Sequence, residues 1–240
     1  MLLIPINFEL IQGKFIRRLN RFMALAEVEG KQIHAHLPNS GRLATTLHPG
    51  VKLYLRRVKS TSSRKSAYSI LAANHNNNIP VIVDAQFSNY LVRGAIEEEL
   101  INGLVGYRII RENIRPGDSN VRLDFLLVDD GNSLYLEVKS VTHVVDGFAL
   151  FPDAPTLRGK RQLLEMLKLL KDGFEAGLMF SVQRPDATYI KPNCDVDPGF
   201  ANLLWVSVEK GLKIFTLKAA FAPQKNAVII WPNEPPFSLQ

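Results

Sequence analysis

Apolar and polar residues alternate along the first third of the chain, and a period of two predicts β-strands. The expected strands cover residues 14–28, 32–37, 51–55, 67–73 and 79–83. Glycine, proline, asparagine and serine punctuate the segments between these strands, which is typical of turns and loops. Five short strands in this space favour a small closed barrel of the OB-fold type, whose curved face commonly binds oligonucleotides.

The pattern after Asp84 mixes helical and strand periods. Helices are expected at residues 89–100, 156–171 and 200–210, and strands at 121–128, 134–138, 176–182 and 213–217. Helices and strands mixed in this way indicate an α/β sandwich around a mixed central sheet. The fold class is therefore α+β with two domains, a barrel at residues 1–82 and the sandwich at residues 83–240.

The helix expected at residues 156–171 has the clearest amphipathic pattern. Thr156 is its expected N-cap, and Gly173 follows its end. Its expected buried stripe is Leu163, Met166, Leu167 and Leu170.

The strands at 121–128 and 134–138 are joined by a segment with Asp130-Gly131 at its centre, a strong signal for a tight hairpin. A turn centred there places Asp124 directly opposite Glu137. Partners across an antiparallel pair lie roughly 5 Å apart at Cβ. Two carboxylates at that spacing repel each other unless a cation lies between them.

Side chains alternate between the two faces of a strand, so four charged residues share one face of the hairpin. They are Arg122, Asp124, Glu137 and Lys139. Leu126 and Val128 continue this face as apolar positions, which indicates that it is partly buried. We therefore favour a functional site over a solvated surface hairpin whose charges neutralise one another, and both interpretations remain open at this point.

Charge is distributed unevenly along the chain. Residues 1–82 contain 12 of the 29 Lys and Arg and 3 of the 23 Asp and Glu, a net of +9, whereas residues 83–240 contain 17 and 20, a net of −3. A strongly basic domain indicates a polyanionic partner, usually nucleic acid. A basic surface that only aids solubility, or a ribosomal or anionic-membrane contact, would produce the same count. The candidate phosphate contacts are Arg17, Arg18, Arg21, Arg42, Arg56, Arg57, Arg64, Lys65, Arg158, Lys160 and Arg161.

Several classes of protein are disfavoured. No run approaches the ~18 apolar residues of a membrane span, and the first residues lack a basic stretch, so a cytoplasmic protein that does not enter a membrane is expected. Cys194 is the only cysteine, which excludes an internal disulfide and cysteine-based zinc or iron–sulfur sites. His34 and His36 have no obvious third metal ligand nearby, and we interpret them as ordinary strand histidines.

An acid on one strand followed by Glu-X-Lys on the next, behind a helix with a further glutamate, resembles the PD-(D/E)XK nuclease superfamily. The resemblance implies that Asp124 and Glu137 hold Mg²⁺ or Mn²⁺ and that Glu97 reaches the ion directly or through water. Lys139 would orient the attacking water or stabilise the charged phosphate. Gln183 matches the glutamine that often follows the third sheet strand of such nucleases.

Longer motifs distributed over nearly the whole chain resemble the sugar fermentation stimulation protein A (SfsA) family. They are Pro38-Asn39-Ser40-Gly41-Arg42, Leu91-Val92-Arg93, Arg122-Leu123-Asp124-Phe125, the stretch from Glu137 to Thr142, the stretch from Leu150 to Thr156, and the stretch from Val182 to Asp186. The resemblance implies an OB-fold, a nuclease-like domain, DNA binding without marked sequence preference and a regulatory role in sugar (maltose) metabolism. Leu157 and Gln162 depart from the family pattern, which usually has an acid and commonly a histidine there.

The sequence thus predicts a sequence-nonspecific DNA-binding protein with a Mg²⁺-dependent phosphodiesterase site, and a homodimer is possible. The alternative is a non-enzymatic DNA-binding regulator that keeps the nuclease fold without activity. A carbohydrate-binding barrel is a third interpretation, but it leaves the basic charge of residues 1–82 unexplained.

Overall fold

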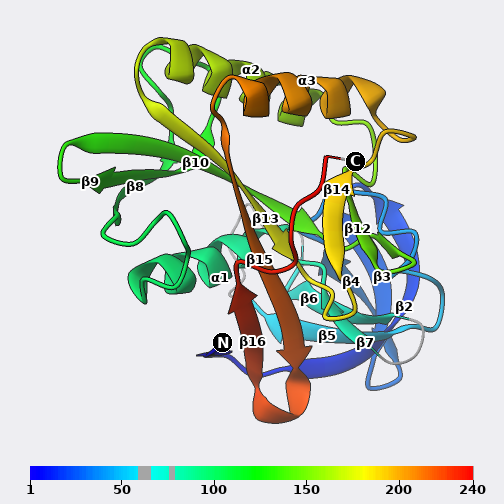
Figure 1. The fold of residues 1–240 in the computed structure, drawn as a ribbon. Coiled ribbons are helices and arrows are strands. Elements are labelled where there is room, and N and C mark those ends of the chain that lie inside the picture. Colours follow the sequence, from blue (N-terminus) through cyan, green and yellow to red (C-terminus); the bar gives the residue numbers. More distant parts are fainter. Residues whose placement is uncertain (59–65, 76–78, 240) are drawn as a thin grey trace.

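The computed structural model describes residues 1–58, 66–75 and 79–239. A β-barrel built from the first third of the chain packs beside a larger α/β unit, and the barrel occupies the blue and cyan part of the molecule in Figure 1. No helix in the described part is long and apolar enough to cross a membrane.

The barrel is a closed ring of strands that pair antiparallel except at its closure, with one extra strand at its side. Its strands are β2 (Ile11–Asn20), β3 (Met23–Val28), β4 (Lys31–His36), β5 (Lys52–Arg57), β6 (Tyr68–His75) and β7 (Ile79–Ile82). They pair in the order β4-β3-β2-β5-β6-β7, and a parallel contact between β4 and β6 closes a ring of five strands. The predicted OB-type barrel is confirmed.

The single strand expected at residues 14–28 is wrong, because the chain reverses at its middle. β2 ends at Asn20 and pairs antiparallel with β3. The side-chain oxygen of Asn20 accepts a hydrogen bond from the backbone N–H of Phe22 at 2.9 Å. Asparagine favours turns through this kind of local bond, which a reading of apolar periodicity alone misses.

The α/β unit is built on a mixed sheet, as predicted, and this sheet has seven strands among the described residues. In spatial order its strands are β1 (Leu2–Pro5), β16 (Ala227–Pro232), β15 (Lys213–Ala222), β13 (Glu175–Val182), β10 (Asn132–Val141), β9 (Leu123–Asp129) and β8 (Arg108–Ile114). The central pairs β10–β13 and β13–β15 are parallel, and the outer pairs are antiparallel. A small separate sheet contains β11 (Val144–Val145), β12 (Phe148–Phe151) and β14 (Tyr189–Pro192).

β1 belongs to the seven-stranded sheet of the α/β unit although it lies at the start of the chain. It pairs antiparallel with β16, so residues 2–5 lie with the α/β unit and not with the barrel. The division into 1–82 and 83–240 therefore misplaces this strand. The pairing joins segments more than 220 residues apart in the sequence, and no local pattern indicates it.

In the described part of the chain, three α-helices cover the sheet: α1 (Ala85–Glu97), α2 (Leu157–Lys171) and α3 (Pro198–Glu209). α1 begins four residues before the predicted helix, because Asp84 caps it by accepting a hydrogen bond from the N–H of Gln86 at 3.0 Å. α2 begins after Thr156, as expected, and Thr156 accepts from the N–H of Gly159. The fully buried residues of α2 include Leu163, Met166 and Leu169, but Leu167 and Leu170 are only half-buried.

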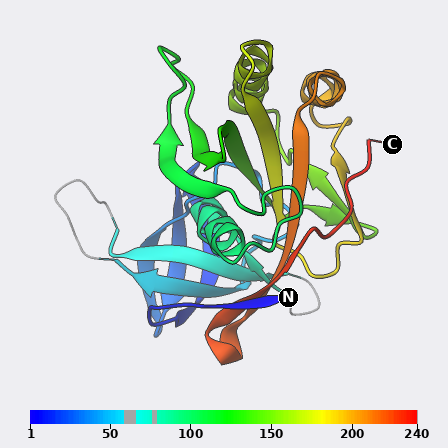
Figure 2. The same ribbon diagram turned by 60° about the vertical axis from the view of Figure 1, so that its left-hand side comes forward.

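The sheet separates two hydrophobic cores. One contains buried residues of α1 together with Leu136, Val138 and Met179, and the other contains buried residues of α2 and α3 together with Leu178 and Phe180. In Figure 2, α1 is seen along its axis between the sheet and the barrel, while α2 and α3 lie on the opposite side of the sheet. The first turns of α1 thus lie where the two units meet.

Candidate functional site

The β9–β10 hairpin has the predicted register. Asp130 and Gly131 both adopt positive φ at the turn, and the pairs run from Asn132–Asp129 to Leu136–Phe125. One further step in this register sets Asp124 against Glu137. The ladder ends just before them, and Asp124 Oδ2 accepts the N–H of Val138 at 2.8 Å. The two strands therefore separate at the point where the charged residues lie.

Glu137 is buried, and only one of its two carboxylate oxygens has a hydrogen-bond partner among the described residues. Its side chain is 3% exposed, and Oε1 accepts a hydrogen bond from Lys139 Nζ at 2.7 Å. Oε2 is buried and has no hydrogen-bond partner in the described part of the chain. Burial raises the pKa of Glu137 to about 7; the charges of Lys139 and Arg158 oppose this, and the nearby carboxylate of Asp124 adds to it. The carboxylate of Asp124 thus lies close enough for its charge to act on Glu137, as the hairpin register predicts.

Lys139 is held between the sheet and α2. Its Nζ also donates to Gln162 Oε1 at 2.6 Å, and Gln162 Nε2 donates to the backbone oxygen of Arg122 at 2.9 Å. Gln162 is buried on α2. From the sequence, Gln162 was noted only as a departure from a family pattern. A polar residue beside Leu163 on the apolar face of a helix could have indicated that it takes part in the site.

The side chain of Gln183 donates its hydrogen bonds to residues of α1 and β13 rather than contacting the Lys139 ammonium group through them. Its Nε2 donates to Ser88 Oγ at 3.1 Å and to Ser181 Oγ at 2.8 Å, which connects α1 to the end of β13. Its Oε1 is buried without a hydrogen-bond partner among the described residues. Ser88 and Ser181 were not identified from the sequence.

The residue that α1 brings to Asp124 is Asn89 and not Glu97. Asn89 Nδ2 donates to Asp124 Oδ1 at 3.0 Å. Glu97 lies eight residues further along α1, roughly 12 Å along the helix axis. Its side chain is 57% exposed and pairs with Arg93 at 3.7 Å. Consistently, the described residues contain no group of three His, Cys, Asp or Glu that could hold a metal ion.

The barrel arginines proposed as phosphate contacts differ in their surroundings. Arg17, Arg21, Arg42 and Arg57 are exposed. The guanidinium of Arg18 instead donates to backbone oxygens of residues 39, 41 and 21 at 2.6 to 2.7 Å, and Arg56 pairs with the buried Asp84 at 3.2 Å. Arg64 and Lys65 lie outside the described residues.

The start of α2 is also only partly available to a ligand. Arg158 and Arg161 are exposed. Lys160 pairs with Asp197 Oδ1 at 3.1 Å, and the side chain of Asp197 is almost fully buried. Arg158 is near enough to Glu137 for its charge to act on that carboxyl group. The arrangement therefore places one exposed cation, Arg158, close to the carboxylate cluster of Asp124 and Glu137.

Comparison with known proteins matches both halves of the chain. Residues 16–83 match the SfsA N-terminal OB domain, and residues 86–225 match the sugar fermentation stimulation protein RE domain. The chain is 38% identical over 224 residues to a sugar fermentation stimulation protein homolog of Moorella thermoacetica, which covers 93% of this chain and 94% of the relative. A homolog of Acetivibrio thermocellus is 39% identical over 209 residues, covering 87% and 88%.

A solved structure shares the whole architecture. The structure of Pyrococcus furiosus SfsA in complex with Ca²⁺ superposes with a TM-score of 0.88 at 29% sequence identity, and the match covers 97% of this chain and 98% of that one.

Proposed function

The chain belongs to the sugar fermentation stimulation protein (SfsA) family, and on that premise we propose that it binds DNA without marked sequence preference and hydrolyses phosphodiesters with Mg²⁺ or Mn²⁺. The active centre consists of Asp124, Glu137 and Lys139. The observation that supports it most directly is the buried Oε2 of Glu137, which has no hydrogen-bond partner in the described structure and lies near a second carboxylate.

The carboxylate oxygens of Asp124 and Glu137 are suitable ligands for a hard divalent cation. Such ions prefer carboxylate oxygens, and a buried carboxylate oxygen without a hydrogen-bond partner has a free position for one. A relative's structure is described as a complex with Ca²⁺, an ion of this class. When bound, the cation would stabilise the negative charge that develops on the phosphate. Among the described residues only two carboxylates meet here, so water or the DNA would complete the coordination.

The side chains of the cluster are oriented before any ligand arrives. Asp124 receives one hydrogen bond at each oxygen, from Asn89 and from the N–H of Val138. Lys139 is held by Glu137 on its own strand and by Gln162 on α2. A positioned ammonium group can orient a water or interact with a developing oxyanion, and preorganised groups of this kind contribute strongly to catalysis.

The second candidate is a DNA-binding regulator without catalytic activity. Two observations favour it. Glu137 is already paired with Lys139, and α1 supplies the amide of Asn89 to the cluster rather than a third carboxylate. In that case the ion pair and Gln162 stabilise the sheet, and the exposed cations alone bind the phosphate backbone.

Thermal melting with and without Mn²⁺ separates the candidates. A cation that binds only the folded protein raises its stability by RT ln(1 + [L]/Kd). We expect Mn²⁺ to raise the melting temperature of the wild type and to leave that of Asp124→Asn unchanged. Glu165→Gln, which changes a carboxylate on α2 outside the cluster, is the matched control and should respond like the wild type. A wild-type melt that is insensitive to both Mg²⁺ and Mn²⁺ contradicts the enzyme proposal.

A further inference from the structure

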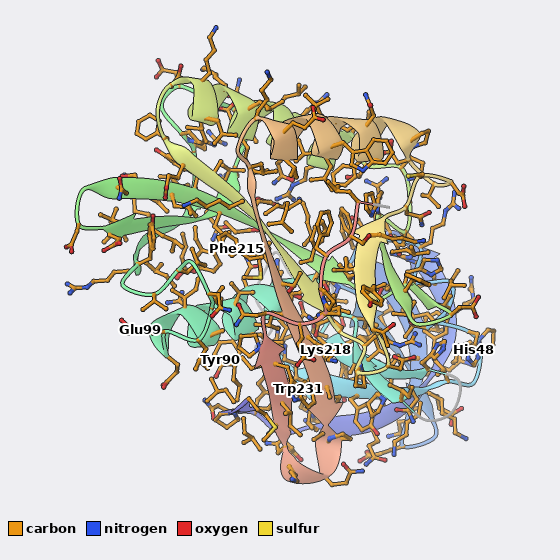
Figure 3. The ribbon with its side chains drawn as sticks, in the orientation of Figure 1. His48, Tyr90, Glu99, Phe215, Lys218 and Trp231 are labelled. Atoms are coloured by element: carbon orange, nitrogen blue, oxygen red, sulfur yellow. The ribbon has the colours of Figure 1, made fainter. Side chains whose placement is uncertain are left out.

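A pocket of about 300 Å³ lies where the barrel meets the α/β unit. Three segments line it: the end of β1 with the residues that follow it, Arg56 of β5, and the N-cap and first turns of α1. Figure 3 labels Tyr90 on α1 and Glu99 just beyond the C-terminal end of that helix. The volume is at the lower end for small-molecule sites, which are often found between domains.

The polar part of the pocket is a neutral ion pair with unused hydrogen-bonding capacity. Arg56 Nη2 lies 3.2 Å from Asp84 Oδ2, and Asp84 Oδ1 caps α1 through Gln86. Arg56 Nε has no hydrogen-bond partner in the described part of the chain. Asn7 and Gln86, whose side chains end in amides, also line the pocket. Because Asp84 already balances Arg56, the pocket does not require a ligand with a net charge.

The apolar part of the pocket is aromatic. The ring of Phe8 has the guanidinium carbon of Arg56 at 5.1 Å from its centroid. The rings of Phe87 and Tyr90 lie 5.2 Å apart, and Tyr90 remains 39% exposed. A flat ring with polar edges suits this combination, because it can stack on aromatic side chains while its edge pairs with the amides. An aliphatic ligand would leave those amides and Arg56 without partners.

The pocket and the carboxylate cluster lie on neighbouring sides of one helix. Asn89, which contacts Asp124, directly precedes Tyr90, which lines the pocket. Consecutive helical residues differ in direction by about 100° and in height by about 1.5 Å. A strand bound at the cluster is therefore close enough to place an unstacked base on the pocket side of α1.

We propose that this pocket binds a nucleobase, stacked against its aromatic wall and hydrogen-bonded along its edge by Asn7, Gln86 and Arg56. The base comes from an unpaired nucleotide in a DNA strand or from a free nucleotide. The first source rests on the DNA binding proposed above, and the second does not. For the first source, the preferred substrate of the cluster is DNA with an unpaired base rather than a perfect duplex.

Three ligands test the proposal in the intact protein: a duplex with one unpaired adenine, the same duplex fully paired, and adenosine monophosphate. Binding is measured by fluorescence anisotropy for the duplexes and by calorimetry for the nucleotide. We expect the wild type to prefer the duplex with the unpaired base by about ten-fold, the scale of one stacked base. Tyr90→Ala and Gln86→Ala should reduce this preference without weakening binding of the paired duplex.

Tyr189→Ala is the matched control, because it removes an exposed tyrosine from the separate three-stranded sheet. It should retain the preference, and thermal melts verify that each variant is folded. Binding of adenosine monophosphate that is lost in Tyr90→Ala, without a preference between duplexes, supports a free nucleotide as the source. Binding of the paired duplex with no preference and no nucleotide binding overturns the pocket proposal and leaves the proposed function intact. Failure of every DNA to bind, with nucleotide binding retained, overturns the proposed function and leaves the pocket.

Discussion

Arg17 and Arg18 are consecutive residues of β2 with different surroundings. Arg17 is exposed, whereas Arg18 donates hydrogen bonds to five backbone oxygens of the described residues, three of them in the loop at residues 39–42. Arg18 therefore stabilises that loop, and its guanidinium is not available to a phosphate in this conformation. The two positions form a natural matched pair, because both carry the same side chain.

Arg18→Ala should lower the free energy of unfolding by about 1–3 kcal/mol, since several carbonyl groups lose a charged donor. Arg17→Ala should change it by less than about 0.5 kcal/mol, as surface substitutions usually do, and should weaken DNA binding instead. Urea unfolding and DNA titrations of both variants provide the measurement. Equal losses of stability would contradict the structural role assigned to Arg18.

Asp84 is a buried carboxylate whose ionisation opposes folding. Burial raises its pKa to about 6 from an ordinary value of 3.8, although Arg56 and the N–H groups of α1 oppose this. Because the folded-state pKa is raised, the folded state holds the proton more tightly than the unfolded state. The contribution of Asp84 to stability is therefore present below about pH 4 and is lost as the pH rises to about 6.

Asp84→Asn keeps an N-cap residue but removes this titration. The stability of the wild type relative to Asp84→Asn should fall by roughly 2–3 kcal/mol between about pH 4 and pH 7. Other titrating groups, including Glu137, are common to both proteins and cancel in the difference. Urea unfolding at several pH values measures it, and a difference that does not change with pH would refute the argument.

At the scale of elements, the basic residues at the start of α2 have two different roles: one is held in an ion pair, and two are exposed and free to contact a ligand. Lys160 pairs with Asp197, and Asp197 also accepts the N–H groups of Thr156 and Phe200, so it links the starts of α2 and α3. The sequence treated Arg158, Lys160 and Arg161 as one group. The structure instead leaves only Arg158 and Arg161 exposed.

Arg158→Ala combined with Arg161→Ala should weaken DNA binding and leave the melting temperature nearly unchanged, because neither side chain is buried. Lys160→Ala should lower stability by about 1–3 kcal/mol, because Asp197 then loses its charged partner in a buried position. Parallel melts and DNA titrations distinguish the two. A double variant that is as unstable as Lys160→Ala would show that all three residues are structural.

Local chemistry made the β9–β10 hairpin predictable. Asp130-Gly131 suits the positive φ angles that both residues adopt, and the turn then sets the register that faces Asp124 with Glu137. The α1 contact was not predictable in the same way. Asn89 rather than Glu97 contacts Asp124, because the packing of the buried α1 residues determines which turn of the helix lies beside the hairpin. That packing depends on residues from the whole sheet.

At the scale of the molecule, β1 makes a simple division of the chain unsuitable for testing DNA binding. A fragment of residues 83–240 would lack the edge strand that pairs with β16. The basic barrel is better tested in the intact chain. A triple variant should replace three exposed arginines by Ala: Arg17, Arg21 and Arg57. We expect the slope of the logarithm of the DNA association constant against the logarithm of the salt concentration to become shallower by about 0.9 for each phosphate that the variant no longer neutralises. An unchanged slope would show that these barrel arginines do not contact DNA phosphates.

The most direct test of the active centre is cleavage of supercoiled plasmid DNA in Mg²⁺ or Mn²⁺ by the wild type and Glu137→Gln. Glutamine keeps the size of the side chain but removes the carboxylate that would hold the cation. The wild type should convert supercoiled plasmid to the nicked or linear form, and Glu137→Gln should leave it intact. A wild type that cuts no plasmid with either ion, or a Glu137→Gln variant that cuts at the wild-type rate, would contradict a phosphodiesterase centred on Asp124 and Glu137.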